Sequence, residues 1–282
     1  MIAIVTDSTC DLGPAQLAQL GVHVVPLHIR IGGAQHLDWV DIDPDALYAK
    51  MQQGQVAETA PPSAEEFKSL YARLLGIYDE VVSIHLSEGI SETAQRAREA
   101  AAELNADGRV RILDSGFATA PLAELVLLAA RLAAAGTPAG EIVARVQRLR
   151  AQVRAEFTVP SLEYLRRGGR LSRAGELLGN LLNIRPILAF DGGKIVADRR
   201  VRGGGAMQDM IARLESTFGS TPISVTIAHA GRDRERIETL RKLLDASTLV
   251  IRQGRIQLIG AVVGAHVGPG TYGLMAHPIA EH

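Results

Sequence analysis

Ser91 lies at the centre of a segment whose residue types suit the binding of an anion. Residues 81–86 form an apolar, β-branched run, residues 87–91 are rich in Ser and Gly, and residues 95–104 are rich in Ala. This order predicts a strand, a tight turn and a helix that starts at Ser91. Free amides and the positive end of the helix dipole favour a carboxylate or a phosphate there. The alternative is that the Ser91 hydroxyl only caps its own helix.

Two aspartates follow other predicted strands. Asp7 comes directly after the apolar run 2–6, and Asp114 comes directly after the run 110–113. In a parallel sheet both strand ends open onto the crevice that is expected to hold Ser91. Paired acids there could bind a metal or act as acid and base, or each could cap the turn that follows it. One hypothesis is therefore a hydrolase or phosphotransferase that uses these three residues, although no G-x-S-x-G motif surrounds the serine.

Two further segments carry basic or glycine-rich chemistry. Residues 166–170 read Arg-Arg-Gly-Gly-Arg and could grip a phosphate or a carboxylate, or form a solvated turn. Residues 264–270 place three glycines around His266, which suits a close approach of backbone to a ligand. This segment has neither the Lys-Ser/Thr end of a P-loop nor the spacing of a dinucleotide motif. His266 is a candidate donor, while a lone histidine more often satisfies a structural bond.

Strands and helices alternate through the first half of the chain. Apolar runs predict strands at residues 2–6, 22–31, 81–86 and 110–113. Capping residues and helix-forming stretches predict helices at residues 11–20, from 43, 63–76, from 91, 117–135 and 137–153. Residues 34–43 and 55–62 are expected to be loops, so Thr59 is placed in a loop ahead of a helix. The alternation favours a parallel α/β sheet with right-handed crossovers.

The pattern changes near residue 155. Residues 184–190 and 194–201 flank an Asp-Gly-Gly turn and predict a β-hairpin. The other strands expected in this half are at residues 156–159, 223–229, 256–263 and 272–278, and the helices at 162–167, 177–183, 206–218 and 233–244. We therefore predict an α/β protein of two domains: a parallel α/β domain at residues 1–155 and an α+β domain with a mixed sheet at residues 156–282.

Composition limits the classes of function. Thirty Lys and Arg residues balance 31 Asp and Glu residues, so no overall field draws the chain to nucleic acid or to an acidic membrane. Cys10 is the single cysteine, which excludes an intramolecular disulfide and argues against a Cys-rich zinc site. No apolar run reaches the length of a spanning helix, and the start lacks the pattern of a signal peptide. We expect a cytoplasmic protein without stable membrane insertion.

Several motifs, in their order along the chain, resemble those of the DegV family. They are Asp-Ser-Thr-Cys-Asp-Leu at 7–12, the loop 59–63, the turn 86–93, Leu-Glu-Tyr-Leu at 162–165, Gly-Gly-Arg-Leu-Ser at 168–172, Pro-Ile-Leu at 186–188 and His-Val-Gly-Pro-Gly at 266–270. The resemblance covers nearly the whole chain. It implies two α/β domains that hold one long-chain fatty acid between them. In some bacteria it also implies the binding subunit of a fatty acid kinase, whose separate ATP-binding subunit converts the acid to an acyl phosphate.

The resemblance also implies site residues. Thr59 and Ser91 match the family hydroxyls that hold the carboxylate of the fatty acid. Arg170 and His266 match segments that lie toward the head group. Two positions depart from the family pattern: Ala60 removes one hydroxyl, and Glu92 puts an acid near a site meant for an anion. A Glu92 side chain that points outward would be harmless, whereas one that points inward would oppose binding.

The function expected from these observations is non-catalytic binding of a long-chain fatty acid, presented to a kinase partner. The fatty acid is the expected ligand, and no metal or other cofactor is expected. The stand-alone enzyme that uses Asp7, Ser91 and Asp114 remains the alternative. A third hypothesis is a regulatory or adaptor protein in which the ligand reports lipid status.

Overall fold

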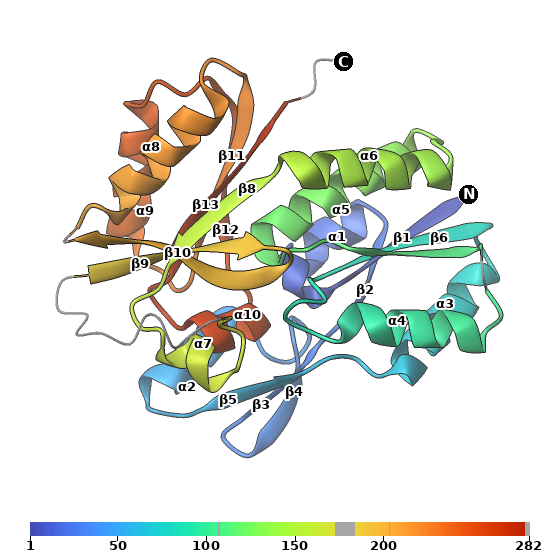
Figure 1. Ribbon diagram of the computed structural model, residues 1–282. Coiled ribbons are helices and arrows are strands. Elements are labelled where there is room, and N and C mark those ends of the chain that lie inside the picture. The colour runs from blue at the N-terminus through green and yellow to red at the C-terminus, as the bar shows by residue number, and fades with distance from the viewer. Residues whose placement is uncertain (107, 173–183, 203, 280–282) are drawn as a thin grey trace.

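A four-stranded parallel sheet forms the core of the first half. The computed structural model describes residues 1–106, 108–172, 184–202 and 204–279 (Figure 1). The strand order is β2 (Val22–Val25), β1 (Ile2–Asp7), β6 (Glu80–His85) and β7 (Val110–Asp114), with every neighbouring pair parallel. Alternate residues of β1 and β6 face opposite sides, so both faces are apolar and both must be covered.

Helices cover both faces of this sheet. The cluster that contains Ala3, Val5 and Val81 packs against α3 (Ala64–Leu75) and α4 (Thr93–Glu103). The opposite cluster, with Ile4 and Val82, packs against α1 (Pro14–Gln19), α5 (Thr119–Ala134) and α6 (Ala139–Gln152). Figure 1 shows α5 and α6 on one side of β1 and β6 and α4 on the other. The parallel α/β arrangement predicted for this half is confirmed.

A six-stranded mixed sheet forms the core of the second half. Its order is β10 (Lys194–Arg202), β9 (Ile184–Asp191), β8 (Arg154–Thr158), β13 (Tyr272–Pro278), β11 (Ile223–His229) and β12 (Ile251–Leu258). β11 and β12 are parallel, and the other neighbouring pairs are antiparallel. α8 (Ala206–Phe218) and α9 (Arg234–Asp245) share a core with one face of the sheet. The predicted hairpin is formed by β9 and β10. The domain boundary at residue 155 stays a prediction.

A third, small sheet differs from the expectation for residues 22–31. The single strand predicted there is two strands, because Pro26, which has no backbone N–H, follows β2 and the chain leaves the parallel sheet. β3 (His28–Ile31) then pairs antiparallel with β4 (Ala34–Leu37) and with β5 (Ala57–Ala60). The predicted loops at 34–43 and 55–62 were therefore wrong in part, since each contains one of these strands. α2 (Pro44–Gln52) begins after its cap, Asp43, as expected.

The remaining differences concern helix positions. α4 begins at Thr93 and α5 at Thr119, each two residues later than predicted. Residues 256–263 were expected to be a strand, followed by a glycine loop at 264–270. Only residues 256–258 belong to a strand, the end of β12, and the helix α10 (Ala261–Val267) follows. α10 packs between α2 and α7 (Glu163–Arg167). The helix predicted at 177–183 lies outside the described residues. Within the part of the chain that the structure describes, no helix has the length and hydropathy needed to cross a membrane.

Candidate ligand-binding site

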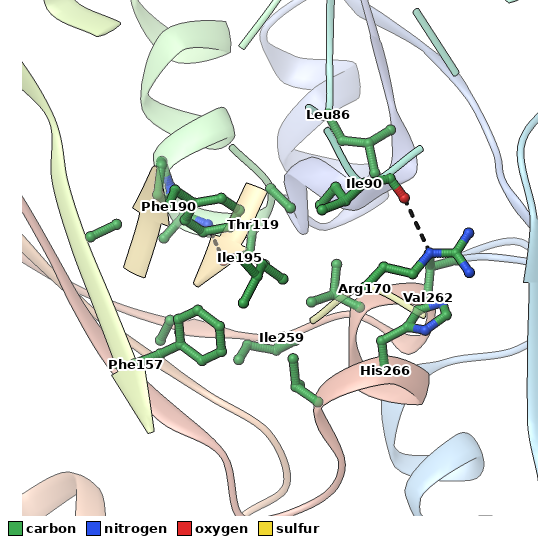
Figure 2. Close-up of a pocket in the computed structure, with 18 of the residues that line it drawn as sticks. Leu86, Ile90, Thr119, Phe157, Arg170, Phe190, Ile195, Ile259, Val262 and His266 are labelled. Carbon is green, nitrogen blue, oxygen red and sulfur yellow. Dashed lines mark hydrogen bonds between the residues drawn. The ribbon is translucent and has the colours of Figure 1, made fainter. Parts of the chain in front are cut away.

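An apolar cavity lies between the two larger sheets. The first half contributes the turn after β6 and the start of α5, and the second half contributes strands β8, β9 and β10 with the segment around α10. Figure 2 shows the labelled apolar side chains that line it: Leu86, Ile90, Phe157, Phe190, Ile195, Ile259 and Val262. A cavity with this lining suits a largely hydrocarbon ligand.

The polar lining residues include all four side chains that were predicted to bind a head group. Thr59 comes from β5, Ser91 from the turn before α4, Arg170 from the turn after α7, and His266 from α10. In Figure 2, Arg170 and His266 lie together, on the side of the cavity opposite Phe157 and Phe190. The cavity therefore has a polar end and an aromatic, apolar end. Their role in holding a carboxylate stays a prediction.

His266 contacts Thr59 directly. Its Nε2 lies 2.7 Å from the Thr59 Oγ1. Burial, and then the charge of Arg170, lowers the pKa of His266 from 6.5 to about 4, so the ring is neutral near pH 7. A neutral imidazole has one N–H donor and one acceptor nitrogen. If Nε2 carries the proton and donates to Thr59, the Thr59 hydroxyl proton is free to donate to a carboxylate.

The Gly-Gly step before Arg170 is explained by His266. A Cβ on Gly168 would lie 2.2 Å from the His266 Nδ1, which is inside any permitted contact. Gly169 has a φ of 69°, in the left-handed region that glycine adopts without steric cost. The two glycines therefore let the turn pass directly over the imidazole and aim Arg170 at the cavity.

Arg170 keeps its charge available. Its Nε donates to the backbone oxygen of Ile90 at 3.2 Å, and its Nη1 donates to the backbone oxygen of Gly168. Among the residues described, its partners are these two carbonyl oxygens, and no carboxylate forms an ion pair with it. A guanidinium held by carbonyl groups, without an acidic partner, can attract an anion.

Ser91 lines the cavity and also bonds the first residue of α4. Its Oγ accepts a hydrogen bond from the Thr93 amide at 3.3 Å and lies 2.9 Å from the Thr93 Oγ1. Glu92, the residue at the N-cap position, places its carboxylate 2.8 Å from the Arg96 Nη2 one turn along α4, and its side chain is 62% exposed. The Glu92 charge thus points into solvent and is compensated, so this departure from the family pattern does not oppose an anion at Ser91.

The crevice proposed for Asp7, Ser91 and Asp114 is not open. Asp7 is fully buried, and each of its oxygens accepts two hydrogen bonds, one pair from Thr9 and the other from His85 and Leu86. The three residues therefore do not surround one volume, and Ser91 is the only one of them that lines the cavity.

The tip of the β9–β10 hairpin fills that crevice. Ser87 Oγ donates to the Gly193 oxygen at 2.6 Å, and a Cβ on Gly89 would lie 2.4 Å from the same oxygen. Asp114 Oδ1 is engaged nearby, where it accepts from the backbone amides of Gly116 and Glu88. The contact between Ser87 and Gly193 joins segments 106 residues apart, and sequence patterns alone did not indicate it.

Sequence reasoning also missed a buried chain of polar side chains. Tyr71 Oη lies 2.8 Å from Ser83 Oγ, Ser83 Oγ lies 2.7 Å from His85 Nε2, and His85 Nδ1 lies 3.0 Å from Asp7. The order Ser, His and Asp matches that of a hydrolytic triad. All four side chains are inaccessible to solvent, so a substrate cannot reach the serine. The alternation along β6 could have signalled Ser83 and His85 as inward-facing polar residues.

The part of the chain that the structure describes contains no group of three or more His, Cys, Asp or Glu residues placed to hold a metal ion. The donors at the polar end of the cavity are hydroxyls, an imidazole and a guanidinium. Such a set suits an anionic head group better than a cation.

Comparisons with known proteins agree with this geometry. A family model described as "Uncharacterised protein, DegV family" matches residues 1–278. A DegV domain-containing protein of Deinococcus radiodurans is 38% identical, with 99% of each chain covered. The solved structure of a DegV family protein from Thermus thermophilus, described with fatty acid binding, superposes with a TM-score of 0.92 at 35% identity and 99% coverage of both chains. DegV of Bacillus subtilis, described as a fatty acid binding protein, gives a TM-score of 0.86 at 29% identity, again with 99% of both chains covered. The chain therefore belongs to the DegV family, as its motifs predicted.

Proposed function

We propose that this protein binds one long-chain fatty acid in the cavity between its two halves and presents the carboxylate to a kinase partner. The observation that supports binding is the cavity itself, with its apolar lining and the polar end at Arg170 and His266. The relatives described as fatty acid binding support the same ligand class. In this proposal the protein is the non-catalytic lipid-binding subunit, needs no metal or cofactor, and works in the cytoplasm.

The carboxylate is proposed to lie among Thr59, Ser91, Arg170 and His266. Two hydroxyls and a guanidinium can satisfy its oxygens, and hydrogen bonds to a charged group are the stronger kind. Burial of the acyl chain supplies about 0.8 kcal/mol per methylene, so a chain of about sixteen carbons gives a gross term on the order of 10 kcal/mol before the cost of association. The tail therefore carries the affinity, and the head group fixes the orientation.

A second hollow supports presentation to a partner. Thr59, Arg170 and His266 also line this hollow, together with Arg167 and the exposed Glu58. The same side chains thus separate the acyl cavity from a polar space at the surface. A carboxylate held by them would be reachable from outside while its tail stays buried.

Lipid extraction tests the ligand. We expect organic solvent to release close to one long-chain fatty acid per chain from the purified protein, identified by mass spectrometry. A chain purified without any fatty acid, and unable to take one up, would contradict the proposal.

The kinase role needs a separate test. Acyl phosphate should form only when the loaded protein, ATP and an ATP-binding partner subunit are combined. Turnover of phosphoesters or acyl esters by the protein alone would instead support the stand-alone enzyme.

A further inference from the structure

Two buried aspartates meet the start of α10 where the two halves of the molecule join. Asp11 follows the 3-10 turn Ser8–Cys10 with a left-handed φ of 56°, and Asp38 follows β4. Only 5% of Asp11 and 1% of Asp38 is exposed. A Cβ on Gly260, the N-cap of α10, would lie 2.1 Å from the Asp11 Oδ1. The Asp11 carboxyl therefore fills a notch that only glycine leaves open.

This junction fixes the position of α10. Gln257 Nε2 donates to the Cys10 backbone oxygen at 2.8 Å, and Tyr48 Oη donates to the Ile259 oxygen at 2.9 Å. The far end of α10 carries His266, which lines the acyl cavity. A short helix thus connects the aspartates at its start with the proposed carboxylate site at its end.

Among the residues that the structure describes, no cationic side chain lies beside the two carboxyls. Within the described residues, none of their four oxygens makes a hydrogen bond of ordinary geometry. The groups that face them are donors: the Gly260 amide and the Trp39 indole for Asp11, and the Ser8 hydroxyl with the first amides of α10 for Asp38. A bound metal needs several oxygen ligands, so these donors argue against one. The same donors favour the ionised carboxyls, but burial is the larger effect and favours the protonated form.

The surroundings raise the affinity of both groups for a proton. Burial raises the pKa of Asp38 from 3.8 to about 7. Burial, and then the charge of Asp38, raises the pKa of Asp11 well above its ordinary value. The other titratable groups that face them are Asp7, Cys10 and Tyr48, and none of these is a cation at neutral pH.

We propose that the contact of Asp11 and Asp38 with the start of α10 is a proton-linked clasp between the two halves of the molecule. Closing the contact takes up a proton, and opening it releases the proton to water. Because α10 also carries His266, the clasp makes the affinity for the fatty acid depend on pH. This last link rests on the proposed function, whereas the clasp itself does not.

The sign follows from the raised proton affinity. The closed form binds more protons than the open form, so closing is most favourable at low pH and weakens as pH rises. Asp38 contributes between its ordinary value of 3.8 and about pH 7. Each proton changes the closing equilibrium by at most tenfold per pH unit in that window. Ligand affinity should also fall with rising pH, by at most tenfold per pH unit.

Trp39, the single tryptophan of the chain, reports on the clasp without any ligand, because its Nε1 lies at the same notch, 2.8 Å from the Cβ position on Gly260. We expect its fluorescence to change with a midpoint at or below about pH 7. Asp38→Asn should abolish the change, while Asp11→Asn and the exposed control Asp245→Asn should keep it. A fluorescence signal flat from pH 5 to 9, or a transition that survives Asp38→Asn, would overturn the clasp. A transition that moves with added Mg²⁺ or Ca²⁺ would overturn it in favour of a cation site.

The ligand link is tested with a long-chain alkyl sulfonate, whose head group stays ionised throughout. Calorimetry of the wild-type protein at pH 6, in two buffers of different ionisation enthalpy, should show net proton uptake, at most about one proton per sulfonate bound. Binding without proton uptake would show that ligand binding in the cavity is not linked to protonation of the clasp. If neither the sulfonate nor a fatty acid binds, the proposed function fails, and the Trp39 titration still decides the clasp.

Discussion

Thr59 Oγ1 and His266 Nε2 lie 2.7 Å apart, although 207 residues separate them in the chain. Thr59 belongs to the small sheet of the first half, and His266 belongs to the helix α10 of the second half. Their contact closes the polar end of the acyl cavity. It forms only when both halves are packed together, so the proposed carboxylate site is a property of the assembled molecule.

A double-mutant cycle on this pair tests its role in binding. We expect Thr59→Val and His266→Gln each to weaken fatty acid affinity by about ten- to a hundredfold, since a hydrogen bond to a charged group is worth about 1.5–3 kcal/mol. The double variant should lose less than the product of the two, because one residue acts through the other. Titration calorimetry with a single fatty acid provides the measurement.

Ser63→Ala is the matched control for the cycle. Ser63 caps α3 outside the cavity, so its loss should lower stability by about 1 kcal/mol and leave affinity unchanged. Strictly additive effects of Thr59→Val and His266→Gln would show that the two side chains act independently.

The buried imidazole also predicts how stability depends on pH. Because the pKa of His266 falls from 6.5 to about 4 on folding, the folded state favours the neutral ring. Its contribution to stability is complete above pH 6.5 and is lost as pH falls toward 4. Urea unfolding of His266→Gln should therefore show a weaker loss of stability over this window than the wild type. Parallel pH profiles for the two proteins would refute the prediction.

Gly168→Ala should damage the site without touching a proposed ligand contact. The added methyl would meet the His266 Nδ1 at 2.2 Å, so the imidazole or the whole turn must move. We expect a loss of affinity of about tenfold or more, by displacement of His266 and Arg170. Gly140→Ala is the control, because a Cβ there has open space in α6 and should raise stability by up to about 1 kcal/mol. Equal affinities for the two variants would count against the role of this turn.

The sequence alone predicted the two larger sheets and named the four candidate residues of the head-group end. Local signals decided these: apolar runs alternating with helical segments for the parallel sheet, an Asp-Gly-Gly turn for the β9–β10 hairpin, and a capping box at Ser63. The four head-group candidates came from the resemblance of their motifs to those of the DegV family, and all four line one cavity.

The errors fall where distant segments decide the outcome. β5 was taken as a loop because its pairing partner, β3, lies about 30 residues away, so no local pattern marks it. α10 was missed because glycine, here Gly264, disfavours a helix. The glycine is needed because a Cβ at this position would lie 2.4 Å from the Tyr48 hydroxyl oxygen. The crevice at Asp7 and Asp114 was expected to be open because nothing near them in sequence reveals that Gly193 covers it.

The aromatic end of the cavity should select the length of the acyl chain. Phe157 lines this end, and its ring centroid lies 6.2 Å from that of Phe190. The Phe190 ring also contacts Phe117, at 5.4 Å between centroids, and Phe117 does not line the cavity. Phe157→Leu makes the side chain smaller and so adds space that a ligand can occupy. A longer tail should gain about 0.8 kcal/mol for each additional buried methylene. We expect the extracted fatty acids to shift toward longer chains by about two carbons, as read by mass spectrometry.

Phe117→Leu is the matched control for this shift. It loosens the packing behind Phe190 but leaves the lining unchanged, so stability should fall while the distribution of extracted chain lengths stays as in the wild type. The same distribution from Phe157→Leu and the wild type would mean that the tail ends short of Phe157. The ligand would then have to turn toward Ile195 and Ile259, and the chain-length limit would lie there.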